Sequence, residues 1–305
     1  MHRFLQRRLL RMIVTLWAVA SAVFLAVRLT GNPVDFLMPE GMDAQGRAAM
    51  IAYWGLDAGL WDQYAAFWHA LAQGDFGLGL AERRPVATIF AERAGRSLGL
   101  LALTLLATLL VGVPLGVAAA VWRRRALGSL VLFAAFLGYA IPNFVLAILL
   151  LLVFSYTLHW LPSAGAASWL HYIMPTVTLS AYFVAALVRY TRNAMLDVLG
   201  QDYMRTAHAK GLPPGVVLLR HGLRNALIPV VTVLGLQVTT LVSGAVVIET
   251  VFAWNGMGDL LVGATLQRDY PVLQFGVLLV AGVVIVVNAL VDLAYAAIDP
   301  RVRLA

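Results

Sequence analysis

Cysteine is absent from the 305 residues of this chain, and charged residues are scarce at 12%. Without a thiol the chain can form no disulfide and no thiolate metal site, and the redox compartment cannot be inferred. A soluble domain has about 25% charged residues, whereas 61% of this chain is hydrophobic. The composition therefore predicts a membrane protein with several spanning segments.

Lysine is almost missing as well, because Lys210 is the only one, and no phosphate-binding loop of the form G-x-x-x-x-G-K-[ST] occurs. We therefore expect no ATP and no Mg²⁺ on this chain. The six histidines lack the spacing of a metal motif, and no Ser/His/Asp or paired-carboxylate pattern stands out. We expect neither a metal site nor catalysis. The excess of basic residues, 22 against 15 acidic, reports on membrane topology here, and nucleic-acid binding is not expected.

Six apolar segments have about the 20 residues needed to cross a bilayer, so the expected fold is an all-α polytopic membrane protein with six transmembrane helices. The segments cover residues 12–27, 97–121, 129–154, 169–190, 227–251 and 272–297. The first could instead belong to a signal peptide, because a basic stretch precedes it. Its length, and small residues that fall in its middle and not after it, favour an uncleaved helix.

The apolar segments divide the chain into three parts. Residues 1–30 form an N-terminal tail and the first helix, residues 31–96 a long external loop subdomain rich in acids and aromatics, and residues 97–305 a core of five helices. If the N-terminus is cytoplasmic, 15 of the 22 basic residues lie on the cytoplasmic side. Positive charge concentrates on that side of membrane proteins. Both termini and the loop 191–226 between the fourth and fifth helices are therefore expected in the cytoplasm.

The longest polar interval in the helical core runs from Tyr203 to Pro229 and contains no acidic residue. Its apolar residues recur at helical spacing, and they are Val216, Leu219, Leu223 and Leu227. Such a segment cannot cross the bilayer. The pattern predicts a cytoplasmic helix at the membrane surface that meets a partner, although a basic loop bound to anionic lipid would have the same charge.

Several motifs together resemble the permeases of ABC importers of the oligopeptide, dipeptide and nickel class, and more narrowly the first of their two paired permease subunits. The pattern R-T-A-x-A-K-G at Arg205–Gly211 is followed by a leucine-rich basic helix and by N-A-L-I-P at Asn225–Pro229. The resemblance covers nearly the whole chain, from Gly31-Asn32-Pro33 to Asp299-Pro300-Arg301. The general permease motif begins Glu-Ala-Ala where this chain has Arg205-Thr206-Ala207, as is usual in the peptide class.

This resemblance implies a set of partners in a bacterial inner membrane. They are a second homologous permease, two cytoplasmic ABC ATPases that hold the ATP and Mg²⁺, an extracytoplasmic solute-binding protein and the lipid bilayer. The cytoplasmic loop would then contain a coupling helix that contacts an ATPase. Its expected contact residues are Arg205, Thr206, Ala207, His208, Ala209, Lys210 and Gly211.

Polar residues near the outer ends of the last two spans form a second candidate site. Glu249, Arg268 and Asp269 are expected to form a gate or to dock the binding protein, with ordinary surface ion pairing as the alternative. Asn288 and Asp292 are four residues apart and share one helix face. Because polar groups inside a membrane are costly, they are candidates for the translocation path, with contact to the second permease or an arginine as the alternative.

The function expected from these observations is that of a non-enzymatic permease subunit of an ATP-driven, binding-protein-dependent importer, most simply for di- or oligopeptides. Nickel chelates, glutathione and sugars are compatible substrates. An ion-driven secondary transporter would need buried carboxylates near the midplane and usually internal repeats, neither of which is evident. A structural membrane subunit that moves no solute is the remaining alternative.

Overall fold

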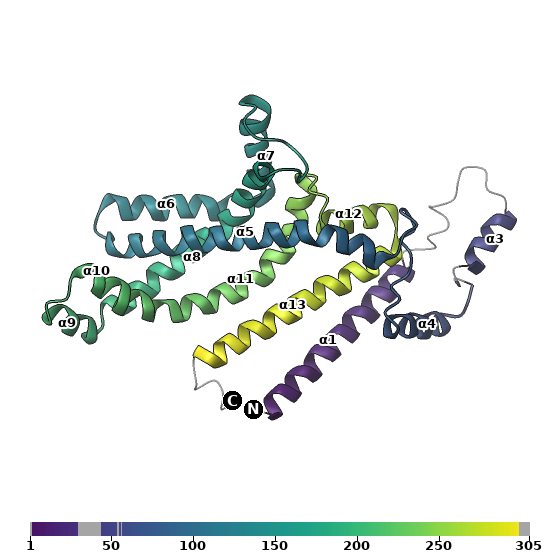
Figure 1. Cartoon of the computed structure of the whole chain (residues 1–305), viewed down its shortest axis with the longest axis horizontal. Coiled ribbons are helices and arrows are strands. Elements are labelled where there is room, and N and C mark those ends of the chain that lie inside the picture. Colours follow the sequence, from purple (N-terminus) through teal and green to yellow (C-terminus); the bar gives the residue numbers. More distant parts are fainter. Residues whose placement is uncertain (1, 30–43, 54, 56, 299–305) are drawn as a thin grey trace. The chain divides into compact units, whose positions relative to one another are not determined.

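The computed structural model describes residues 2–29, 44–53, 55 and 57–298, and within these ranges every regular element is a helix (Figure 1). Two motifs of the resemblance, Gly31-Asn32-Pro33 and Asp299-Pro300-Arg301, lie outside the described residues. The elements are α1 His2–Leu29, α3 Ala44–Tyr53, α4 Leu60–Ala72, α5 Val86–Val121, α6 Ala126–Ala140, α7 Asn143–Leu150, η1 Leu151–Thr157, α8 Trp169–Leu199, α9 Asp202–Ala209, α10 Pro214–Val216, η2 Val217–Leu223, α11 Arg224–Val251, α12 Met257–Gln267 and α13 Tyr270–Ile298.

Five of the described helices are long and apolar enough to cross a membrane, and a bent pair of helices raises the number to six if it forms one span. Large apolar side chains are exposed along these helices, among them Leu10, Leu110 and Phe136. Helices that are apolar on all sides are typical of a membrane environment. The expectation of an all-α polytopic membrane protein is therefore confirmed.

The bent pair lies where the sequence predicts a single span over residues 129–154. Ala126–Ala140 and Asn143–Thr157 meet at an angle of 100°. Ile141, the residue before Pro142, has the extended conformation that a following proline favours. Pro142 then precedes the first residue of α7. Pro114, Pro175 and Pro229 lie inside continuous helices, so a proline alone does not explain where a span breaks.

The chain forms two compact units, residues 1–95 with 256–285, and residues 96–255 with 286–305. In the first unit, the N-terminal turns of α5 pack against α12 and the beginning of α13 through Val86, Phe90, Ala264 and Val272. Elsewhere in this unit, α1 packs against α4, where the ring of Phe24 lies 5.3 Å from that of Tyr64. Apolar and aromatic burial therefore stabilises this unit.

In the second unit, α8 is the central helix, and it contacts α6, α7 and α11. Its residues Met174, Leu179 and Phe183 are buried in a cluster with Leu241 and Ile248 of α11. The C-terminal end of α8 leads directly into α9, the helix that contains the expected coupling residues. The position of α9 is thus set by α8 on one side and α11 on the other.

Candidate functional site

The candidate coupling site is built around α9, a helix of eight residues between α8 and η2. Asp202 lies in its first turn and His208 in its last, which suits the partial charges at the two ends of a helix. Thr206 donates to the carbonyl of Asp202 at 3.1 Å, and His208 donates from Nδ1 to the carbonyl of Met204 at 2.8 Å. A helix this short is not stable alone. The two bonds, from side chains of α9 to its own backbone, help to stabilise it.

One face of α9 is buried within the chain itself. Met204 is 2% exposed and Ala207 is 6% exposed, and both pack against Val217 of η2 together with Val198 and Leu199 of α8. Burying a methionine side chain contributes about 1.5–3 kcal/mol. Ala207 was expected to contact a partner, and the structure places it in this internal cluster. Its small size permits α9 to lie close to η2.

The turn after α9 depends on backbone conformation. Gly211 has φ +76° and its amide donates to the carbonyl of His208 at 2.9 Å. Only glycine adopts this left-handed conformation without strain, and it commonly ends a helix in this way. Pro213 and Pro214 follow, and the carbonyl of Pro213 accepts the amide of Val216. Proline at the first position of a helix costs no hydrogen bond, so the chain turns directly into α10.

The connection from this turn to α11 is a π-helix, η2, of seven residues. In a π-helix the backbone bonds join residues five apart, so the buried face advances differently from that of an α-helix. The buried positions here are Val217, Gly222, Ala226 and Val230. The apolar residues at α-helical spacing, Val216, Leu219, Leu223 and Leu227, do not coincide with this buried face, since Leu219 is 60% exposed.

A side-chain bond joins α9 to α11. Asn225 donates from Nδ2 to the hydroxyl of Tyr203 at 3.2 Å and to the carbonyl of His221 at 2.8 Å. Asn225 belongs to the N-A-L-I-P motif, but the sequence gives no indication that Tyr203 is its partner. With the apolar contact of Met204 and Val217, this bond makes α9 and the start of α11 one packed structure.

The exposed face of α9 is polar and basic. Arg205, Thr206, His208, Ala209 and Lys210 are all exposed. The pair of Arg205 and Asp202 spans 3.5 Å with side chains 80% and 95% exposed, so it contributes little to stability. These side chains are available to a partner, whereas Ala207 is not.

Asp269, a buried residue of the second candidate site, connects two segments of the first unit. Its Oδ1 accepts the amide of Val272 at 3.4 Å, which caps the first turn of α13, and its Oδ2 accepts the amide of Ala81 at 3.0 Å. Asp269 is 3% exposed, so its carboxylate is directed into the chain. Arg268, the residue before it, has φ 54° and ends α12 in the left-handed conformation. Both residues therefore shape the turn between α12 and α13.

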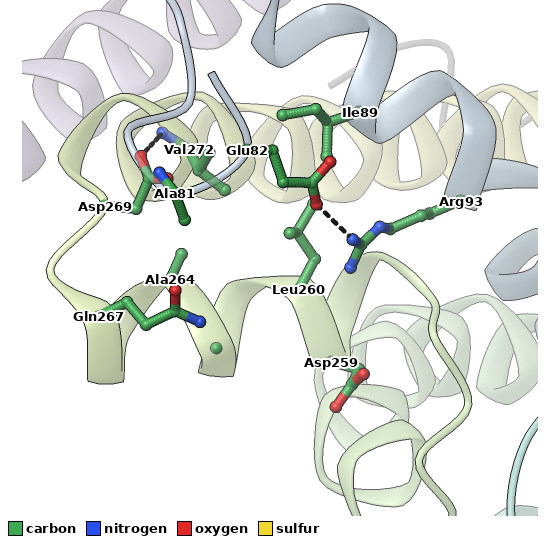
Figure 2. Close-up of a pocket in the computed structure, with 11 residues that line it drawn as sticks. Ala81, Glu82, Ile89, Arg93, Asp259, Leu260, Ala264, Gln267, Asp269 and Val272 are labelled. Atoms are coloured by element: carbon green, nitrogen blue, oxygen red, sulfur yellow. Dashed lines mark hydrogen bonds and ion pairs between the residues drawn. The ribbon is translucent and has the colours of Figure 1, made fainter. Parts of the chain in front are cut away.

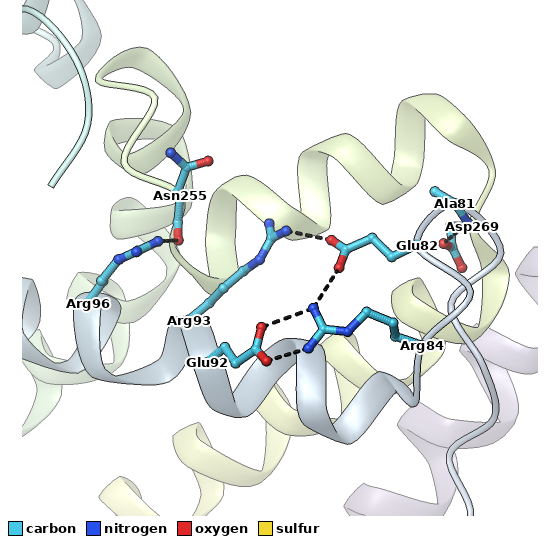
Figure 3. A network of polar contacts seen from close by, with 8 residues as sticks. All are labelled: Ala81, Glu82, Arg84, Glu92, Arg93, Arg96, Asn255 and Asp269. Atoms are coloured by element: carbon cyan, nitrogen blue, oxygen red, sulfur yellow. Dashed lines mark hydrogen bonds and ion pairs between the residues drawn. The ribbon is translucent and has the colours of Figure 1, made fainter. Parts of the chain in front are cut away.

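An ion-pair network lies beside this turn (Figure 3). Arg93 bonds Glu82 at 2.6 Å, and Arg84 contacts Glu82 at 3.5 Å and holds both carboxylate oxygens of Glu92. The hydrogen bonds with Glu92, supported by the charge of Glu82, raise the pKa of Arg84 above its ordinary value. A cavity of about 290 Å³ lies next to the network, and Glu82, Arg93, Asp259 and Gln267 provide its polar lining (Figure 2).

The remaining predicted residues do not come together into one site. Glu249 is 2% exposed at the end of α11, so its side chain is not on an accessible surface of the chain. Asn288 accepts a hydrogen bond from Thr239 of α11 at 3.0 Å. The side chain of Asp292 lies outside the described residues. No group of three potential metal ligands occurs among the residues that were described.

Comparison with known proteins gives a consistent result. Residues 112–304 match the model of the family described as binding-protein-dependent transport system inner membrane component. The chain is 45% identical over 307 aligned residues, covering 99% of both chains, to the glutathione transport system permease protein GsiC of Salmonella typhimurium. It is equally similar, with the same coverage, to GsiC of Escherichia coli strain K12.

Solved structures show the same fold. An inward-facing form of the MetNI methionine ABC transporter aligns with a TM-score of 0.59 at 18% identity, over 70% of this chain and 97% of that chain. An amino acid ABC transporter crystallised with histidines aligns with a TM-score of 0.51 at 14% identity, over 69% and 94%. At these identities the likeness shows a common fold and says nothing about which solute this chain transports.

Proposed function

The chain belongs to the family of binding-protein-dependent transport system inner membrane components, and on that premise we propose that it is the permease subunit of an ATP-driven importer of glutathione and related short peptides. The proposed complex contains a second homologous permease, two cytoplasmic ATPases that hold the ATP and Mg²⁺, and an extracytoplasmic solute-binding protein. The observation that carries the substrate is the 45% identity to glutathione permeases over 99% of both chains.

Within this proposal, α9 is the element that contacts an ATPase. Its exposed residues Arg205, Thr206, His208 and Lys210 form the contact surface, while Met204 and Ala207 hold the helix to the chain. Since α9 is packed against η2 and bonded to Asn225 of α11, a displacement of α9 is transmitted to a spanning helix. Rigid movement of packed helices is an established route from a local contact to a global change.

Reconstitution tests the function directly. The full complex, with both permeases, the ATPases and the binding protein, is placed in liposomes and supplied with ³⁵S-labelled glutathione. We expect uptake that requires ATP and the binding protein and that continues when the proton gradient is collapsed. Uptake driven by an ion gradient without ATP would support a secondary transporter and contradict the proposal. A complex that takes up no glutathione with ATP would remove glutathione as the substrate.

A matched pair of glycine variants tests the role of α9. Gly211→Ala forces a side chain into the left-handed region, at a cost of about 1–2 kcal/mol, and should displace the end of α9. Gly215→Ala serves as the control, because Gly215 has no positive φ and the described atoms leave open space around an added Cβ. We expect Gly211→Ala to lower glutathione uptake severalfold relative to ATP hydrolysis, and Gly215→Ala to leave this ratio unchanged. Equal ratios in the two variants would contradict the coupling role.

A further inference from the structure

A second cavity, of about 540 Å³, lies within the first unit between the end of α1, α4 and the beginning of α13. Its volume falls in the range of about 300–1,000 Å³ that is typical of ligand sites. The polar residues of its lining are Arg28, Asp62, Gln63, Asp75 and Gln274. It shares no lining residue with the cavity beside the ion-pair network, so the sites described above do not account for it.

Arg28 is held in a fixed orientation at the edge of this cavity. Its Nε donates to Oε1 of Gln63 at 2.6 Å, and its guanidinium carbon lies 4.9 Å from the ring centre of Phe24. Among the described residues, Arg28 has no carboxylate within ion-pair distance, and Nη1 and Nη2 have no hydrogen-bond partner. Two parallel guanidinium donors of this kind match the oxygens of a phosphate or a carboxylate.

A second donor in the cavity also lacks an acceptor. Nε2 of Gln274 on α13 is buried and has no hydrogen-bond partner in the part of the chain that the structure describes. Buried polar groups in folded proteins are nearly always hydrogen-bonded. Arg28 and Gln274 therefore give the cavity donors from two different helices, and both donors fit an oxyanion.

Carboxylates occupy another part of the cavity wall. Asp62 lies in the first turn of α4, and Asp75 follows that helix and accepts the amide of Gly77 at 2.9 Å. Both aspartates are exposed, and neither lies within ion-pair distance of Arg28, although all three residues line the cavity. This separation of charges matches a ligand that contains an oxyanion and, at some distance from it, an ammonium group.

The cavity lies at the ends of two apolar spans. The candidate spans of α1 and α13 cover Arg8–Leu29 and Tyr270–Ala289, so Arg28 lies at the last turn of one and Gln274 in the second turn of the other. Asp269 comes directly before α13. Charged residues at both ends mark the level of the lipid headgroups, where an arginine at a helix end reaches the interface.

The rest of the wall is apolar, and it includes Phe67, Phe76, Phe275 and Leu278. Leu278 comes seven residues after Pro271, which also lines the cavity, so the lining extends about 10 Å along α13. This direction leads into the apolar span. Such a wall suits the beginning of an acyl chain, whereas a small hydrophilic peptide would leave it uncovered.

We propose that this cavity binds a phospholipid whose head contains a phosphate and a primary ammonium group, such as phosphatidylethanolamine. Arg28 and Gln274 bind the phosphate, Asp62 and Asp75 bind the ammonium group, and the apolar wall contacts an acyl chain. The bound lipid joins α1, α4 and α13. This site goes beyond the proposed function, because it concerns the membrane around the chain and not the solute.

Lipid retention by the full complex tests the phosphate contact. The complex is taken from nanodiscs that contain equal amounts of phosphatidylethanolamine and phosphatidylglycerol, and native mass spectrometry measures the lipid that it keeps. We expect wild type to keep phosphatidylethanolamine in preference. Arg28→Gln should lower this retention about tenfold, since charge-assisted bonds to phosphate are strong. Arg83→Gln, at an exposed arginine of the same unit outside the cavity, should behave like wild type. Equal retention of both lipids by wild type, or equal loss in the two variants, would overturn the site.

A change of lipid preference tests the ammonium contact. Asp62→Asn removes a charge but keeps the size of the side chain, so the preference should shift from phosphatidylethanolamine toward phosphatidylglycerol. Asp57→Asn is the matched control, because Asp57 is exposed and does not line the cavity. A purely structural role of Asp62 would not alter the choice between headgroups. An unchanged preference in Asp62→Asn would therefore contradict the contact.

Crosslinking identifies the occupant without relying on transport. The residue p-benzoylphenylalanine is placed at Leu278 in the full complex, and the nanodiscs are illuminated with and without excess labelled glutathione. Adducts enriched in phosphatidylethanolamine above its share of the bilayer support the site, provided that the same replacement at exposed Leu110 gives adducts in proportion to the bilayer. Adducts in the same proportion at both positions overturn it. Label from glutathione at Leu278, or lipid adducts lost when glutathione is added, would show a solute site instead.

Discussion

The α9 segment and the turn between Leu78 and Pro85 are both short connections beside spanning helices, yet different forces hold them. Around α9, apolar burial of Met204 and the positive φ of Gly211 fix the backbone, and the ion pair there is exposed. In the Leu78–Pro85 turn, the buried carboxylate of Asp269 binds Ala81, and neighbouring arginines and glutamates pair. Salt screens exposed ion pairs, whereas this screening does not act on apolar burial or on backbone conformation.

This difference indicates how each region can respond. A segment held by packing moves as a rigid piece, which suits the transmission of force from an ATPase. A segment held by charge can exchange its partners for those of an approaching protein, as in the contacts of Arg84 with both Glu82 and Glu92 (Figure 3). Variants of the two regions should therefore respond differently to a change of charge and to salt.

The largest effect is expected from a charge in the packed region. Ala207→Glu buries a carboxylate among Met204 and Val217, and an uncompensated buried charge costs about 3–5 kcal/mol. We expect α9 to detach, so that trypsin cuts after Arg205 and Lys210 much faster than in wild type. Ala209→Glu is the matched control on the exposed face of the same helix, and its effect should stay within about 0.5 kcal/mol. Similar digestion of both variants would show that the buried face of α9 is assigned incorrectly.

An intermediate effect is expected from Asp269→Ala in the other region. This change leaves the amide of buried Val272 without its acceptor, at about 1–3 kcal/mol, and it frees the amide of Ala81, an exposed residue, from the carboxylate. Hydrogen exchange of Ala81 and its neighbours should accelerate accordingly. Asp269→Asn retains one carbonyl oxygen and should fall between wild type and Asp269→Ala. Exchange that is unchanged in both variants would mean that the carboxylate does not hold the turn.

The smallest effect is expected from Glu82→Gln, which removes the charge shared by Arg84 and Arg93. Exposed pairs contribute about 0.2–1 kcal/mol each, so the melting temperature should fall by a few degrees at low salt. The difference from wild type should vanish at about 1 M salt, where the Debye length is about 3 Å. A difference that persists at high salt would mean that packing and not charge is responsible.

Much of the fold could be predicted from the sequence, because the signals are local. Apolar runs of about 20 residues indicate membrane helices, and R-T-A-x-A-K-G with N-A-L-I-P locates the cytoplasmic segment. The site within that segment was predicted less well. The pattern contains Ala207 and Gly211, but it does not say that one is buried and that the other ends the helix.

The remaining features depend on contacts between distant residues or on backbone geometry. Asp269 and Ala81 are 188 positions apart, and no sequence pattern connects them. Arg189 and Tyr139 are 50 positions apart, and only the packing of α6 on α8 shows the guanidinium of Arg189 beside the ring of Tyr139. The 100° break after α6 could not be told from the prolines, since three others leave their helices continuous.

The π-helix η2 has a consequence for how the cytoplasmic segment tolerates changes in length. Each residue of an α-helix turns the chain by about 100°, and a π-helix is equivalent to an α-helix that has gained one residue. Deleting one residue between Val217 and Leu223 would restore α-helical winding and rotate α9 by about that angle relative to α11. The face that now holds Met204 and Ala207 against Val217 would then point elsewhere. The extra residue thus sets the angle at which α9 is presented, and length is as strictly constrained here as composition.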